Sequence, residues 1–145
     1  SIEKKVEAID WKPDLIISSY HGIPKKYFDK GDPYHCYCHK TTRLIKEKYK
    51  SINIETTFQS RFGPQEWLTP YTDKTLENLP KKGIKKVLVI CPGFASDCVE
   101  TLEEINIQGR ESFLNQGGEN FDLIPCLNDN TDHIELFEKL VTKYI

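Results

Sequence analysis

The sequence lacks methionine, long apolar runs and any block of charges of one sign. Its longest apolar stretch, residues 87–95, is interrupted by Pro92 and is far shorter than the roughly 20 residues that a membrane-spanning helix needs. The 20 basic and 22 acidic side chains are scattered along the chain, so they do not form the concentrated positive surface of a nucleic-acid-binding protein. We therefore expect no nucleic-acid partner and at most peripheral contact with a membrane.

A secretory signal, with a basic start and an apolar centre, is also missing from the first residues, which favours a cytoplasmic location. Ile2, Val6 and Ile9 have helical spacing from the very start of the chain. Together with the lack of methionine, this spacing predicts that the sequence is a piece of a longer protein.

Two further absences narrow the class of function. No Gly-rich phosphate-binding loop follows a predicted strand and no Gly-x-Ser-x-Gly turn occurs, so nucleotide binding and esterase chemistry lose support. The five cysteines are odd in number and lie partly within apolar segments, unlike the disulfide framework of a small secreted domain. We expect reduced thiols.

The sequence does contain a regular alternation of strand-like and helix-like segments. Apolar and β-branched runs predict strands at 14–19, 52–58, 85–91 and 121–126. Amphipathic spacing predicts helices at 41–49, with a start signal upstream at Asp32 and Pro33, at 72–79, from 96 or 97 to 115, and from 130 or 131 to 141. This order predicts one α/β domain over residues 1–145, with a four-stranded parallel sheet and helices on both faces.

The loops that follow the predicted strands are residues 20–24, 59–70, 92–100 and 126–130. In open parallel sheets, ligands bind at the carboxyl ends of the strands, where such loops meet. The first three loops also contain the most unusual polar and aromatic residues, so we expect the functional site at this edge of the sheet.

His21 directly follows the first predicted strand and precedes a turn with Gly22 and Pro24. On its own it could equally be a structural histidine that bonds a neighbouring carbonyl group. Beyond the third strand, Glu100 and Glu104 are four residues apart at a predicted helix start and so share a face. The helix dipole explains some of this acidity, but an imidazole opposite two stacked carboxylates could also bind a divalent metal or pass on protons.

Aromatic residues gather near the same predicted edge: Tyr20, Phe58, Phe62, Trp67 and Phe94. Each could be a packing anchor. A pocket lined by rings with a few polar groups would also suit a large planar ligand.

Residues 35–39 form the most metal-like string, because His35, Cys36, Cys38 and His39 carry imidazole and thiol groups that suit zinc or an iron-sulfur cluster. A single Cys-x-Cys lacks the second pair of a four-ligand site. Ordinary surface residues at a helix start are the alternative interpretation.

Several separate blocks, in order, resemble the carboxyl-terminal half of bacterial ferrochelatases. They cover nearly the whole chain and are residues 19–24 (SYHGIP), 31–34 (GDPY), 57–63 (TFQSRFG), 67–73 (WLTPYTD) and 91–104 (CPGFASDCVETLEE). The resemblance implies a flavodoxin-like chelatase half that inserts Fe2+ into protoporphyrin IX, the last step of haem synthesis. It also implies the amino-terminal half as partner, no required cofactor, and little activity from this piece alone.

The resemblance also implies roles for single residues. His21 and Glu100 would face each other at the substrate iron and the pyrrole nitrogens, and Glu104 and Asp97 would continue a proton path. The porphyrin-binding residues would be Tyr20, Ser60, Trp67, Phe94 and Ser96.

Two residues depart from the family pattern, and two other functions stay open as alternatives. Cys98 stands where some relatives have histidine, and Gln108 occupies a place where others carry a third acid. A [2Fe-2S] cluster, known in some relatives, is not predicted. The rivals are a cobalt chelatase for a sirohydrochlorin-type tetrapyrrole and a catalytically silent metal- or haem-binding module built on residues 35–39.

Overall fold

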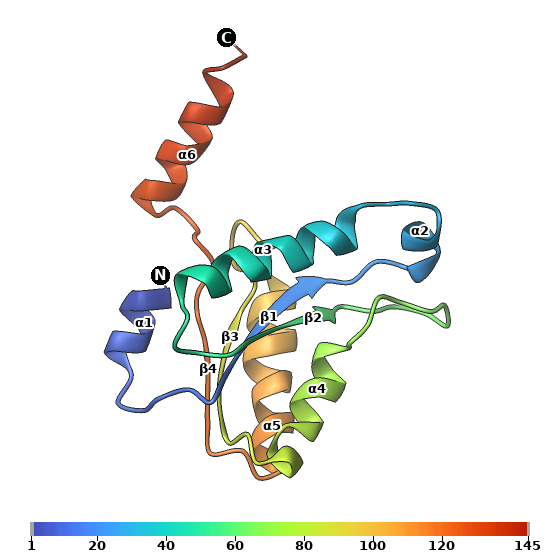
Figure 1. The fold of residues 1–145 in the computed structure, drawn as a ribbon, viewed down its shortest axis with the longest axis vertical. Helices are drawn as coiled ribbons and strands as arrows, with labels where there is room; N and C mark the ends of the chain where they lie inside the picture. Colours follow the sequence, from blue (N-terminus) through green and yellow to red (C-terminus); the bar gives the residue numbers. More distant parts are fainter. Residues whose placement is uncertain (1, 145) are drawn as a thin grey trace.

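The computed structural model describes residues 2–144, which form a four-stranded parallel sheet with helices on both faces (Figure 1). The strands are β1 (Leu15–His21), β2 (Ile54–Gln59), β3 (Lys86–Ile90) and β4 (Asn120–Leu123), and they lie in the order β2-β1-β3-β4. Every neighbouring pair is parallel. The predicted α/β class and sheet are confirmed.

Helices cover the two faces of the sheet as separate layers. The helical elements are α1 (Ile2–Ala8), α2 (Lys25–Asp29), α3 (Tyr34–Lys48), α4 (Thr72–Asn78), the 3-10 turn η1 (Pro80–Lys82), the π-helix η2 (Glu100–Gly109), α5 (Arg110–Asn115) and α6 (Thr131–Val141). In Figure 1, α1 and α3 lie on one side of the sheet, and α4 and α5 lie on the other.

Alternate strand residues face two different apolar cores, because side chains along a strand point to opposite faces. The core on the α4 and α5 side includes Ile17, Val89, Leu76, Ile105 and Phe113. The core on the α1 and α3 side includes Ile16, Leu88, Ile2 and Ile45. The sheet is thus buried on both faces, as expected of a parallel sheet.

Two strands, β1 and β4, end at other residues than predicted. β1 runs on to His21, which pairs with Gln59 at the end of β2, so His21 ends the strand instead of following it. β4 ends at Leu123, well before the predicted Cys126. Pro125 follows closely and has no N–H to continue the ladder.

α3 begins at Tyr34, seven residues before the predicted helix from 41. The predicted start signal upstream is confirmed, because Asp32 Oδ1 accepts a hydrogen bond from the Tyr34 N–H at 2.9 Å. Residues 35–39 therefore lie in the first turns of a helix.

The predicted helix from 96 or 97 begins instead at Glu100, and its first ten residues form the π-helix η2. π-helices are rare and are mostly single turns. The buried positions of η2 are Thr101, Ile105 and Gly109, four apart twice in succession. Leu102, which directly follows the buried Thr101, is 49% exposed.

α6 extends away from the rest of the domain (Figure 1). Its predicted cap is confirmed, because Asn130 Oδ1 accepts a hydrogen bond from the Asp132 N–H at 3.1 Å. Its apolar stripe is also present, but most of it is uncovered: Ile134, Phe137, Leu140 and Val141 are 44–54% exposed. Among residues 2–144, none of the helices combines the length and the apolar character that crossing a membrane requires.

Candidate active site

His21 lies at the carboxyl edge of the sheet, at the end of β1. Its Nδ1 is 2.7 Å from the carbonyl oxygen of Gly22. Because a carbonyl oxygen only accepts hydrogen bonds, Nδ1 carries the proton, and in the neutral ring Nε2 keeps its lone pair. His21 is half-buried, so that lone pair can receive a proton or a metal ion.

The backbone around His21 is fixed from two directions. The Tyr34 hydroxyl of α3 donates to the His21 carbonyl oxygen at 2.8 Å. The Gly22 N–H donates to the Gln59 carbonyl oxygen at 2.8 Å. A side chain at Gly22 would lie 3.0 Å from that oxygen and 3.3 Å from the Trp67 ring, so this close approach requires glycine.

Glu100 is the first residue of η2 and is half-buried. The neighbouring Cys98 side chain donates to its carboxylate and lowers its pKa, and the backbone N–H of Glu100 and the charge of protonated His21 act in the same direction. Glu100 is therefore ionised at neutral pH and within electrostatic reach of His21, and the catalytic roles of the two residues stay predictions.

Gln59 connects the sheet to η2. Its Nε2 donates to the Glu100 carbonyl oxygen at 2.7 Å, and to the Glu104 carboxylate at 3.4 Å. Its Oε1 accepts from the Ser19 hydroxyl at 2.7 Å and the Cys91 thiol at 3.6 Å. These partners fix the orientation of the amide, which is only 3% exposed.

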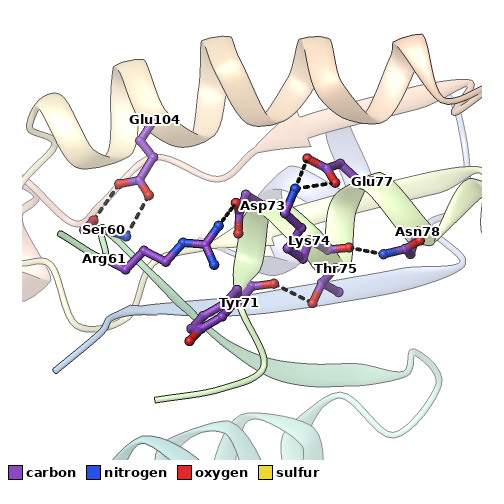
Figure 2. Close-up of polar contacts among 9 residues, drawn as sticks. All are labelled: Ser60, Arg61, Tyr71, Asp73, Lys74, Thr75, Glu77, Asn78 and Glu104. Carbon is purple, nitrogen blue, oxygen red and sulfur yellow. Dashed lines mark hydrogen bonds and ion pairs between the residues drawn. The ribbon is translucent and has the colours of Figure 1, made fainter. Parts of the chain in front are cut away.

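Glu104 accepts two hydrogen bonds from Ser60, from the backbone N–H at 2.7 Å and from the hydroxyl at 2.5 Å (Figure 2). Ser60 has a φ of 63°, a left-handed conformation that is unfavourable for a residue other than glycine. The Glu104 carboxylate therefore holds a strained residue at the end of β2.

A cavity of about 340 Å3 lies between α4 and η2 and is bordered by Glu104, Asp73, Glu77 and Gln108. Arg61 also borders it and forms an ion pair with Asp73 (Figure 2). The acidic side chains of the two helices thus share one polar cavity that begins beside Ser60.

The comparisons with known proteins agree with this geometry. The family model described as Ferrochelatase matches residues 1–145. The chain belongs to the ferrochelatase family. It is 55% identical to the ferrochelatase of Rhizobium etli (strain CIAT 652), covering 99% of this chain and 42% of that protein. It is 49% identical to the ferrochelatase of Francisella tularensis subsp. novicida, covering 99% of this chain and 44% of that protein. The chain therefore spans less than half the length of these relatives.

A solved structure supports the fold alone. The cobalamin (vitamin B12) biosynthesis CbiX protein from Marinobacter aquaeolei is 14% identical and superposes with a TM-score of 0.56. The match covers 91% of this chain and 97% of that one, so a protein of about this size can consist of this fold.

Of the residues expected to line the porphyrin pocket of a ferrochelatase, Phe94 and Ser96 lie at the edge of the sheet that carries His21, and their contact with a porphyrin stays a prediction. Ser96 is exposed, and the Phe94 ring centroid is 6.3 Å from that of His21. Ser60 lies at the same edge, held by Glu104. These three residues come from the two loops that flank His21.

Tyr20 and Trp67 need correction. Tyr20 is 3% exposed, its hydroxyl bonds Ser18 and Thr42, and it packs under α3, because alternation along β1 turns it away from the cleft. Trp67 is 9% exposed, and its indole N–H donates to the Phe62 carbonyl oxygen at 3.0 Å. Both are packing anchors of this ferrochelatase half and present no open wall to a ligand.

Asp97 is held by hydrogen bonds and is not open to the cleft. Burial alone would raise its pKa, but hydrogen bonds from Asn128, Cys126 and Thr101 together lower the pKa below its ordinary value. Asn128 Nδ2 donates to Asp97 at 2.8 Å, and the Asp97 N–H donates back to Asn128 Oδ1 at 2.8 Å. These contacts favour an anchoring role, and the expected proton-path role stays a prediction.

Sequence reasoning missed Gln59, Tyr34 and Asn128 as parts of the site. Gln59 and Tyr34 lay inside blocks that resemble ferrochelatases, and for Gln59 its position at the end of a strand was a further signal. Asn128 acts through contacts with Asp97, 31 residues away, and no local pattern indicates it.

The two cysteines of residues 35–39 lie in different surroundings. Cys36 is exposed, whereas Cys38 is 3% exposed and packs with Tyr20 beneath α3. Within residues 2–144, no three His, Cys, Asp or Glu side chains are grouped to hold a metal ion. Binding of a metal or a cluster by these cysteines stays a hypothesis.

Proposed function

We propose that this chain supplies one side of the cleft in which a ferrochelatase inserts Fe2+ into protoporphyrin IX. The observation that carries the proposal is that His21, with a free Nε2 lone pair, and the ionised Glu100, which feels the charge of His21, lie at one sheet edge in a chain of the ferrochelatase family. Insertion must remove two protons from the pyrrole nitrogens. A neutral imidazole accepts such a proton, and a nearby carboxylate stabilises the imidazolium that results.

The acidic cavity supports a route for protons away from the cleft. Glu104 follows Glu100 along η2 and borders the cavity that also contains Asp73 and Glu77. A proton leaving His21 could pass along these carboxylates to solvent. Asp97 is the further candidate for this route, and hydrogen bonds hold both of its oxygen atoms, as they hold those of Glu104.

The porphyrin would lie over Phe94, Ser96 and Ser60, with Trp67 and Tyr20 supporting the backbone beneath. Iron is a substrate here, and no resident cofactor is part of the proposal. Location in the cytoplasm stays a prediction, which cell fractionation tests.

The remainder of the ferrochelatase chain is the proposed partner. The apolar stripe of α6 is uncovered in residues 2–144, and more than half of each relative lies outside the matched region. A second apolar surface lies beside α1, where a cavity of about 310 Å3 is bordered by Ile2, Ile45, Tyr49, Ile90, Ile124 and Leu127. Contact with another part of the enzyme would bury these two apolar surfaces and remove them from water.

The test is iron insertion by the full-length enzyme, measured by absorption with protoporphyrin IX and with sirohydrochlorin. We expect His21→Ala and Glu100→Gln each to lower kcat by at least about 10²-fold, and we expect protoporphyrin to be the preferred substrate. Glu111→Gln, on the exposed surface of α5, is the matched control.

Normal insertion by either site variant would overturn the assignment of that residue. Preference for sirohydrochlorin with cobalt would overturn the substrate and support the cobalt chelatase instead. The isolated residues 1–145 should show no turnover above the uncatalysed rate, because they supply one side of the cleft.

A further inference from the structure

Residues 35–39 have no part in the proposed cleft, and their two histidines are unusually placed. His35 and His39 are four residues apart in the first turns of α3, so they project from the same side of the helix. Their ring centroids are 4.4 Å apart and the ring planes are tilted by 48°. The two thiols between them lie in other surroundings. Cys36 is exposed to solvent, and Cys38 is buried beneath the helix.

This separation is close to that of two imidazoles that bind one metal ion at a right angle. A metal bound to two imidazole nitrogens at about 2.1 Å holds the ring centroids on the order of 4.5 Å apart when the two bonds meet at 90°, and on the order of 5.3 Å apart at the tetrahedral angle that zinc prefers. A histidine pair at this helical spacing can therefore chelate one ion with small rotations of the rings.

The ring nitrogens of the pair are available. Among residues 2–144, the histidine nitrogens that hydrogen-bond protein atoms belong to His21 and His133. His35 stacks on Phe58 at 5.6 Å and contacts Phe28 at 4.8 Å, so aromatic rings hold it from two elements. A fixed ring loses less conformational freedom when it binds an ion.

We propose that His35 and His39 bind one divalent late first-row transition-metal ion, with water completing its coordination. Imidazole suits Zn2+, Cu2+ and Ni2+. Because only two ligands would come from the protein, the bound ion would exchange readily with ions in solution. The site is separate from the cleft, because Phe58 beneath it belongs to the apolar cluster on the α3 side of the sheet. Glu104 lies on η2, among the elements of the opposite face.

The experiment is a Zn2+ titration of the full-length enzyme without porphyrin, followed by calorimetry. His21→Ala is used as the background, so that binding in the cleft does not obscure the signal. We expect one site in this background, and we expect His35→Asn or His39→Asn to weaken it at least tenfold, since even loss of an outer-shell partner costs about that much.

A register variant is the matched control. The double substitution H39K with K40H keeps the number of histidines but changes their spacing from four to five, and it should also lose the site. In the otherwise unaltered protein, the 15N resonances of both rings should shift together on addition of Zn2+. Zn2+ binding unchanged by all three variants, or ring resonances that do not move, would overturn the proposal without affecting iron insertion.

Discussion

At the scale of single residues, Gln59 determines where Glu100 lies. Its amide bonds the Glu100 backbone and is itself oriented by Ser19 and Cys91. Gln59→Leu removes these bonds while nearly preserving side-chain size. We expect kcat for iron insertion to fall on the order of 10–100-fold, because small displacements of reacting groups have effects of this size.

The comparison that isolates this effect is Gln116→Leu, at the exposed end of α5, which should leave kcat unchanged. A positioning role also predicts partial recovery in Gln59→Glu at low pH, where a protonated carboxyl can again donate to the Glu100 carbonyl oxygen. Equal activity of Gln59→Leu and the unaltered enzyme would refute the assignment.

Asp97 makes a second residue-scale prediction, this time for stability. Its carboxylate accepts from Asn128, Cys126 and Thr101. Asp97→Asn places its NH2 group against at least one of these donors, and we expect a loss of about 1–3 kcal/mol in the free energy of unfolding at pH 7.

The pH dependence follows from the lowered pKa of Asp97. Because the folded-state pKa lies below the ordinary value of 3.8, the stabilisation is complete above that pH and disappears as pH falls through the folded-state pKa. Urea unfolding of the full-length enzyme and of Asp97→Asn should therefore give converging midpoints below pH 3.8. A constant difference between the midpoints down to pH 2 would contradict this account.

At the scale of elements, the turn between α5 and β4 is packed closely against a buried ring. A Cβ atom at Gly118 would lie 2.2 Å from the ring of Phe113, which is fully buried. Gly118→Ala forces this ring to move and should lower the free energy of unfolding by about 1–3 kcal/mol. Thermal or urea unfolding measures the loss, and Glu119→Ala, exposed in the same turn, should change stability by less than about 0.5 kcal/mol.

The sequence predicted the elements well where local signals are strong. The apolar runs of β1 and β3 and the cap at Asn130 were identified correctly. The π-helix was not, because no local spacing in residues 100–109 distinguishes it from an α-helix.

The site was predictable only in part. His21 and Glu100 were found because strand ends in a parallel sheet share one edge. Tyr20 was misassigned because its neighbour His21 marks the cleft, and alternation along β1 sends the two side chains to opposite faces. Extending the predicted strand by two residues would have revealed this.

At the scale of the whole molecule, the sheet separates two surfaces with different uses. Glu100, Glu104 and the acidic cavity belong to the η2 side, whereas α3 carries the histidine pair on the other. α6 belongs to neither core. An isolated helix of 11 residues is marginally stable in water, so α6 needs a partner surface to persist.

Leu140 provides the sharpest test of that partner, because Phe137 already contacts the ring of His133 within the chain. In the full-length enzyme, we expect Leu140→Asp to lower the free energy of unfolding by about 3 kcal/mol, since it places a charge in an apolar contact. Hydrogen exchange of the α6 amides should accelerate in the same variant. Glu135→Gln, on the side of α6 opposite the stripe, should change neither quantity. If α6 amides already exchange within seconds in the unaltered full-length enzyme, the stripe has no partner there. If their protection grows with protein concentration, the partner is a second copy and not the rest of the same chain.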